Sequence, residues 1–173
     1  MQVSVGKSYH IKDEFFELVK DDKLMANKEG GSYRPHFFFF ADPKTAGIYW
    51  AVPQSSRVEK YRLLINQKIK KYGRCNTIVV GEFGGRDSAF LIQNMFPIIE
   101  KYVDHEHTIG GMSVIIHTAL SETIISDAHQ VLALWQRGYK LVFPDIDKIY
   151  AIMQRELILQ ANGSNDTVGQ INK

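Results

Sequence analysis

The sequence predicts an α+β fold in which a single domain builds an antiparallel sheet flanked by about four helices. Its 173 residues, 45% hydrophobic and 23% charged, suit one domain with its own core. Short apolar runs joined by glycine-rich turns predict hairpins, which favour antiparallel pairing over a doubly wound sheet. Apolar residues spaced at threes and fours predict helices. We expect the domain to span residues 1–160 and the polar residues 161–173 to form a disordered tail.

In the first half of the chain, two predicted helices enclose a predicted hairpin. The expected helices are residues 12–23 and 58–72, and the expected strands are residues 36–41 and 48–52. The paired glycines in residues 27–32 predict a loop. Pro53 lacks an amide donor, so the second strand is expected to stop or to lie at a sheet edge there.

The second half of the chain begins with another hairpin and ends in two helices. The predicted strands are residues 77–81 and 89–93, and the predicted helices are residues 120–135 and 145–159. Residues 103–112 combine charged residues, two histidines and paired glycines, which predicts a linker or an exposed turn.

Positive charge is concentrated in one segment, although the formal net charge is only +2. Residues 57–74 hold seven basic side chains and one acid, and they coincide with a predicted amphipathic helix. A basic helix face can bind nucleic acid phosphates, so Lys68, Lys70 and Lys71 are candidate RNA contacts. A merely solvated face is the alternative.

Several functional classes are excluded or disfavoured by the residues that are absent. The lone Cys75 allows no internal disulfide and no multi-cysteine zinc site, and it favours a reducing, cytoplasmic location. We find no secretory signal, no apolar run of the ~20 residues that a membrane span needs, and no glycine-rich nucleotide loop. His105 and His107 form a close pair without a fixed third ligand, so we predict neither a metal site nor a cofactor.

Two adjacent hydroxyl residues, Ser55 and Ser56, stand between a predicted strand and the basic helix. Backbone amides at a helix start, together with nearby Arg57 and Lys60, would stabilise a phosphate there. The hydroxyls could instead simply cap the helix. The arrangement therefore suggests RNA phosphodiester binding or cleavage.

Four short motifs carry a resemblance to a known family. They are residues 9–12 (YHIK), 34–37 (RPHF), 50–56 (WAVPQSS) and 90–97 (FLIQNMFP). In this order they resemble the ToxN/AbiQ endoribonuclease toxins of type III toxin–antitoxin systems, and the resemblance covers about residues 8–103.

The resemblance implies a highly twisted antiparallel sheet related to the MazF and Kid toxins. It implies metal-independent cleavage of RNA to a 2',3'-cyclic phosphate, growth inhibition and abortive phage infection, without a cofactor. It also implies inhibition by a small repetitive antitoxin RNA, bound between toxin subunits in a cyclic or other RNA–protein assembly.

The resemblance also suggests site residues. Ser56 falls on the family serine near the scissile phosphate, Ser55 on the preceding hydroxyl residue, and His36 where relatives often have lysine. The family lysine after the serine has no fixed counterpart, so either Arg57 or Lys60 could supply the charge. The expected RNA-binding residues beyond the basic helix are Tyr9, Lys12, Gln54, Gln93 and Asn94.

His36 is the expected proton carrier, because an imidazole with a pKa near ~6.5 exists in both forms at neutral pH. A core position is the alternative for His36, and a packing role is the alternative for Tyr9. Two other functions stay open. The chain could be a non-catalytic RNA-binding module, or a MazF-like ribonuclease with a protein antitoxin.

Overall fold

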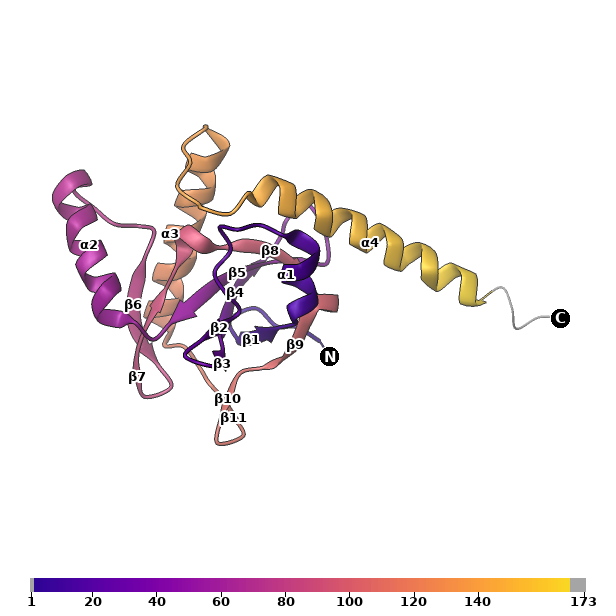
Figure 1. The fold of residues 1–173 in the computed structure, drawn as a ribbon, viewed down its shortest axis with the longest axis horizontal. Coiled ribbons are helices and arrows are strands. Elements are labelled where there is room, and N and C mark those ends of the chain that lie inside the picture. Colours follow the sequence, from indigo (N-terminus) through magenta and orange to yellow (C-terminus); the bar gives the residue numbers. More distant parts are fainter. Residues whose placement is uncertain (1, 169–173) are drawn as a thin grey trace.

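An antiparallel sheet lies at the centre of the computed structural model, which describes residues 2–168 and the side chains of residues 2–163 (Figure 1). Within this part of the chain its seven strands follow the order β6-β7-β5-β4-β1-β9, and β8 also pairs with β5. They are β1 (Ser8–Ile11), β4 (His36–Ala41), β5 (Ile48–Ser55), β6 (Val79–Phe83), β7 (Arg86–Phe90), β8 (Phe96–Ile99) and β9 (Val103–Glu106). The predicted α+β class is confirmed.

Helices cover both faces of this sheet. The helices are α1 (Asp13–Val19), α2 (Val58–Tyr72), α3 (Thr118–Gln136) and α4 (Ile146–Val168), with 3-10 turns at Ile92–Asn94 and Glu100–Tyr102. Helices α1 and α4 pack on one face, α3 packs on the other, and α2 lies against β6 and β7 (Figure 1). None of the helices within residues 2–168 has the length and apolar character of a membrane span.

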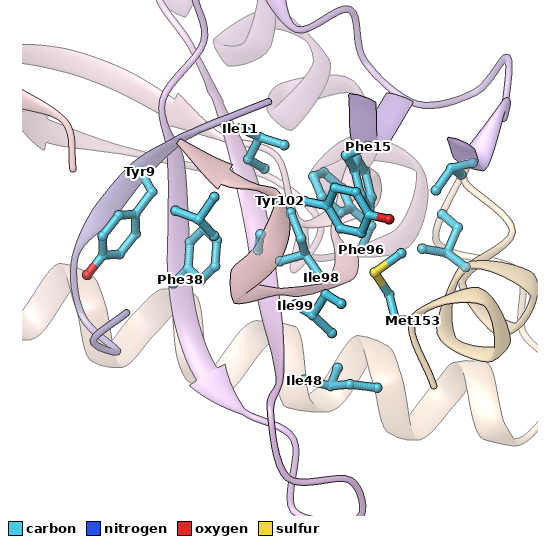
Figure 2. Packing of buried hydrophobic residues seen from close by; sticks show 14 of the residues in the cluster. Tyr9, Ile11, Phe15, Phe38, Ile48, Phe96, Ile98, Ile99, Tyr102 and Met153 are labelled. Carbon is cyan, nitrogen blue, oxygen red and sulfur yellow. The ribbon is translucent and has the colours of Figure 1, made fainter. Parts of the chain in front are cut away.

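Strand β4 sends the side chains of Phe37, Phe38 and Phe39 to alternate faces of the sheet, as strand geometry requires. Phe38 packs edge-on against Tyr9 in the cluster that α1 and α4 cover, to which Phe96 also belongs (Figure 2). Phe37 and Phe39 belong to the opposite cluster, which α3 covers. Phe37, Phe38 and Phe39 of β4 are therefore buried on both faces of the sheet, as expected for a central strand.

Strand β5 continues through Pro53, where the sequence predicted its end or an edge position. One edge of β5 pairs with β8 along its first half and with β7 only at Gln54 and Ser55. Pro53 lies between these two ladders, so its missing amide interrupts neither. The strand can therefore carry Gln54 and Ser55 in a regular, buried position.

Four stretches without a predicted strand contain strands, and the first of them is β1. Residues 27–32 lie in a hairpin, β2 (Lys28–Glu29) with β3 (Ser32–Tyr33), β8 follows the second predicted hairpin, and the supposed linker contains β9. A second small hairpin, β10 (Thr108–Ile109) with β11 (Met112–Ser113), follows β9. Strand β9 lies at the sheet edge, where charged side chains are common because they discourage pairing with another chain.

Helix α4 ends at Val168, which differs from the predicted disordered tail at residues 161–173. Residues 161–168 are helical, and residues 169–173 lie outside the described residues. The helix is anchored by buried Ile149 and Met153, and each residue added to an existing helix gains a backbone hydrogen bond without new nucleation. Polar composition alone did not reveal this extension.

Candidate active site

A cleft of about 510 Å³ opens where β5 ends and α2 is about to begin. Its walls come from β1, the β2–β3 hairpin, the end of β5, the β6–β7 hairpin and the segment around β9. The polar side chains that line it include His10, Glu29, Tyr33, Arg34, Gln54, Ser55, Ser56, Arg86, His105 and His107. Three of the predicted site residues, Gln54, Ser55 and Ser56, are therefore brought together here.

The Glu29 carboxylate is the meeting point of four donors in this cleft. Ser55 Oγ donates to its Oε1 at 2.9 Å, and Arg34 Nη1 donates to its Oε2 at 2.9 Å. The Nε of Arg57 lies 3.2 Å from Oε1, and the Ser56 amide lies 3.4 Å from Oε2. Two guanidinium groups, a hydroxyl and an amide therefore surround a single anionic group.

The structure separates the two candidate cations that follow the serines. Arg57 reaches the cleft through its ion pair with Glu29, while 65% of its side chain stays exposed. Neither side chain lines the cleft itself, and the Lys60 Nζ lies 5.5 Å from the centre of the Tyr61 ring. Arg57 is thus the better placed of the two to meet a phosphate at Ser56.

Gln54 forms part of the cleft wall although only 1% of it is exposed. Its Nε2 donates to Ser8 Oγ at 2.7 Å. Its Oε1 is buried and has no hydrogen-bond partner among the described residues. Buried acceptors are rarely left unpaired in folded proteins, so this oxygen is an open position for a donor.

Three histidines gather on the opposite side of the cleft from residues that are distant in sequence. His10 Nε2 lies 2.9 Å from His107 Nδ1, so the two neutral rings share one proton. The His10 ring also stacks on His105 at a centroid distance of 4.6 Å. His105 Nδ1 lies 2.8 Å from Asp104 Oδ2, which orients that ring.

The environment keeps two of these histidines neutral at neutral pH. Burial, followed by the neighbouring His105 and His107, lowers the pKa of His10 to about 4. Burial, followed by His105 and Arg86, lowers the pKa of His107 as well. Both rings are therefore neutral imidazoles, a form that can accept a proton.

The structure places His36, the expected proton carrier, in the core and not in the lining of the cleft. His36 is fully buried in β4, edge-on to Phe96 at 5.6 Å, and it does not line the cleft. Burial lowers its pKa to about 3, and neither ring nitrogen has a side-chain partner among the described residues. The alternative reading, a core histidine, describes it, because β4 is central and covered on both faces.

Four predicted RNA-binding residues also lie away from the cleft. Tyr9 is 1% exposed, and its hydroxyl bonds to the Ser4 backbone. Lys12 Nζ donates to the Lys101 carbonyl at 2.9 Å on a different part of the surface. The remaining two are buried in the turn before β8, with exposed fractions of 5% and 7%; they are Gln93 and Asn94. Gln93 and Asn94 are therefore packed inside the protein and do not face the cleft.

The lysines predicted as RNA contacts on helix α2 differ in exposure and in hydrogen bonding. Lys70 and Lys71 are exposed, as predicted for phosphate contacts. Lys68 is half-buried, and its Nζ donates to Thr77 Oγ1 at 2.7 Å and to Gln93 Oε1 at 2.8 Å. Lys68, which was also predicted as an RNA contact, therefore connects α2 to the adjoining loops in this structure.

Sequence reasoning missed several residues of this cleft. The His105 and His107 pair was visible, but its partner His10 is brought to it only by the antiparallel pairing of β1 with β9. Glu29 carried no signal because its loop was not recognised as a hairpin. Arg34 was visible as the basic residue before the first predicted strand, and this position in its motif could have identified it.

Structural comparison gives this fold two well-described neighbours. One is AbiQ, a lactococcal anti-phage endoribonuclease of the type III toxin–antitoxin system, with a TM-score of 0.64, 13% identity, and coverage of 92% of this chain and 99% of that chain. The chain has the AbiQ fold. A protein of a bacterial antiviral system that a processed non-coding RNA regulates is equally similar, with a TM-score of 0.64, 17% identity, and coverage of 86% and 97%.

A third neighbour comes from a study of selective toxin inhibition by a non-coding RNA pseudoknot in bacterial type III toxin–antitoxin systems. It has a TM-score of 0.60 and 17% identity, and the match covers 88% of this chain and 98% of that chain. No protein-family model and no curated protein matches the sequence. The similarity therefore lies in the fold and spans nearly the whole of each neighbour.

Proposed function

We propose that this protein is an endoribonuclease toxin that cleaves RNA in the cleft at the end of β5. One observation carries this proposal. The histidine pair His10 and His107 lines the same cleft as Ser55 and Ser56, where hydroxyl and amide groups can donate hydrogen bonds to a phosphate. Proton carriers and anion donors in one cleft are the parts that RNA cleavage requires. The AbiQ fold supports the same conclusion independently.

The proposed reaction is an internal transesterification of RNA. The 2'-oxygen attacks the adjacent phosphorus, the bond from phosphorus to the 5'-oxygen breaks, and a 2',3'-cyclic phosphate forms. A base takes the proton of the 2'-hydroxyl, and an acid gives one to the departing 5'-oxygen. Both transfers are within the chemistry of a neutral histidine pair that shares a proton, so no metal ion is required in this scheme.

Each remaining polar group has a proposed part in this reaction. Ser55, Ser56 and the Ser56 amide donate to the non-bridging oxygens, where negative charge accumulates in the transition state. Arg57 supplies positive charge at the rim of the cleft, and Arg86 supplies it on the β6–β7 side. The unpaired Oε1 of Gln54 accepts a hydrogen bond from the ribose or the base.

A small non-coding RNA is the proposed inhibitor. The exposed lysines of α2 extend the positive surface away from the cleft, which suits a folded RNA that contacts both. The two RNA-regulated neighbours support this form of control, and the anti-phage neighbour supports a role in phage defence. We propose that toxin and antitoxin RNA form a repeating assembly in the cytoplasm.

Incubating the purified protein with a long RNA, with and without a chelator, tests this function. We expect cleavage in both conditions, loss of cleavage with the His107→Gln variant, and none of a DNA of the same sequence. Binding without cleavage would indicate a non-catalytic RNA-binding module. Tandem repeats in the DNA upstream would indicate an RNA antitoxin, whereas a small reading frame there would indicate a protein antitoxin.

A further inference from the structure

We propose that the donors around Glu29 form the binding site for the RNA phosphate, and that Glu29 occupies this site until RNA displaces it. The proposal rests on the proposed function and adds a location and an internal competitor to it. Glu29 would then act as a built-in phosphate substitute, which lowers the affinity of the empty protein for anions.

The donor set around Glu29 matches a phosphodiester in charge and in geometry. Arg34, Arg57, the Ser55 hydroxyl and the Ser56 amide all reach the two carboxylate oxygens within 3.4 Å. A phosphodiester also presents two oxygens that share one negative charge. Its non-bridging oxygens can replace Oε1 and Oε2 without changing the local charge.

Burial explains why this position always needs an anion. Arg34 is only 5% exposed, and the carbonyls of Ala26 and Gln54 hold its guanidinium at 3.1 Å and 2.5 Å. A buried charge that loses its partner is strongly destabilising. Without Glu29, Arg34 would keep only these two carbonyl partners, so exchange with phosphate is favoured over simple opening.

The segment that carries Glu29 lies outside the central sheet and is tied to β1 and α1 by side-chain hydrogen bonds of Asn27 and Tyr33. Strands β2 and β3 pair only with each other, in a two-stranded sheet apart from the central one. Their turn is Gly30–Gly31, with φ of +59° and +85°, a left-handed conformation that glycine adopts without strain. Displacing this hairpin breaks no strand pairing of the central sheet.

A second feature of the same cleft points to a ligand that is more than an anion. The buried Oε1 of Gln54 needs a donor, and no donor contacts it among the described residues. An RNA nucleotide brings both a phosphate and a 2'-hydroxyl donor, the group that distinguishes RNA from DNA. RNA therefore supplies both an anion for the donors around Glu29 and a donor of the kind that the Gln54 oxygen lacks.

Titration of inorganic phosphate by calorimetry tests the exchange without using RNA. Glu29→Gln keeps the shape of the side chain and removes its charge, so we expect phosphate to bind about tenfold more tightly or better, because the site is no longer occupied by a competing anion. Glu122→Gln removes an equal charge from the exposed side of α3 and is the matched control. Phosphate affinity of Glu29→Gln within twofold of either the wild type or this control would overturn the proposal.

A measurement on the wild-type protein covers the case in which Glu29→Gln does not fold. In NMR spectra, saturating phosphate should shift the Ser56 amide and the Arg57 Nε–H signals with one common dissociation constant. Shifts confined to the lysines of α2 would refute the site. Neither experiment measures RNA cleavage, so the anion site and the nuclease activity are tested separately. The protein can prove to have the anion site without nuclease activity, or nuclease activity without this anion site.

Discussion

Acidification should destabilise this protein through His36, the core histidine of β4. Burial lowers the pKa of its ring to about 3 in the folded state, against 6.5 for an unperturbed histidine. Below pH 6.5 the unfolded chain therefore binds a proton that the folded chain does not, so stability falls as pH falls. At about 1.4 kcal/mol for each pH unit, the folded state loses about 2 kcal/mol between pH 6.5 and pH 5.

Urea unfolding of the wild type and of His36→Phe, at pH 7 and at pH 5, measures this term. We expect the wild type to lose about 2 kcal/mol more stability than the variant between the two conditions. His10 contributes in the same direction but is present in both proteins, so its effect cancels. Equal losses would show that His36 does not stay neutral inside the fold, and loss of RNA cleavage by a folded His36→Phe would contradict our placement of the site.

Three further perturbations address the cleft and the basic helix. His107→Gln should lower the cleavage rate about 10²-fold or more, while His117→Gln, an exposed histidine outside the cleft, should leave it unchanged; single-turnover kinetics distinguishes them. Ser56→Ala should lower the rate about 10²-fold with an unchanged melting temperature, and a normal rate would remove Ser56 from the mechanism. Replacing both Lys70 and Lys71 with Gln should reduce the salt slope of single-stranded RNA binding by about 1.4, and an unchanged slope would mean that these lysines are only solvated.

Lys68 supplies the contrast for the lysine experiment. Because its ammonium is tied to Thr77 and Gln93, Lys68→Gln should lower the free energy of unfolding by about 1 kcal/mol or more through the unpaired groups it leaves. Its effect on the salt slope should be smaller than that of one exposed lysine. The reverse pattern would show that Lys68 leaves these partners to bind RNA.

Local patterns were sufficient for the four helices and for the hairpin of β4 and β5. The three- and four-residue spacing from Val58 to Tyr72 gave helix α2, and the β-rich runs around β4 and β5 gave their hairpin. Pro53 led to a wrong end for β5, because proline disrupts a strand only where its position needs an amide donor. Pro53 lies in the gap between the pairing of β5 with β8 and its pairing with β7, so no donor is needed there. Strand β9 was missed because edge strands need not be apolar.

The site could be predicted only in part, for a similar physical reason. The Ser55 and Ser56 pair is local in sequence, so its place before a basic helix was readable. The contact between His10 and His107 depends on strand register across almost a hundred residues, which no local pattern encodes. His36 had the right chemistry for catalysis, but its burial follows from the position of β4 in the sheet.

The ends of the cleaved RNA test the central claim most directly. Attack by the 2'-oxygen in this cleft predicts fragments that carry a 2',3'-cyclic phosphate and a 5'-hydroxyl, and it predicts no cut at a nucleotide whose 2'-hydroxyl is replaced by hydrogen. Mass spectrometry of a short RNA and of its singly deoxy-substituted counterpart reads both outcomes. Fragments with 5'-phosphate ends, or equal cutting of the two oligonucleotides, would contradict the account.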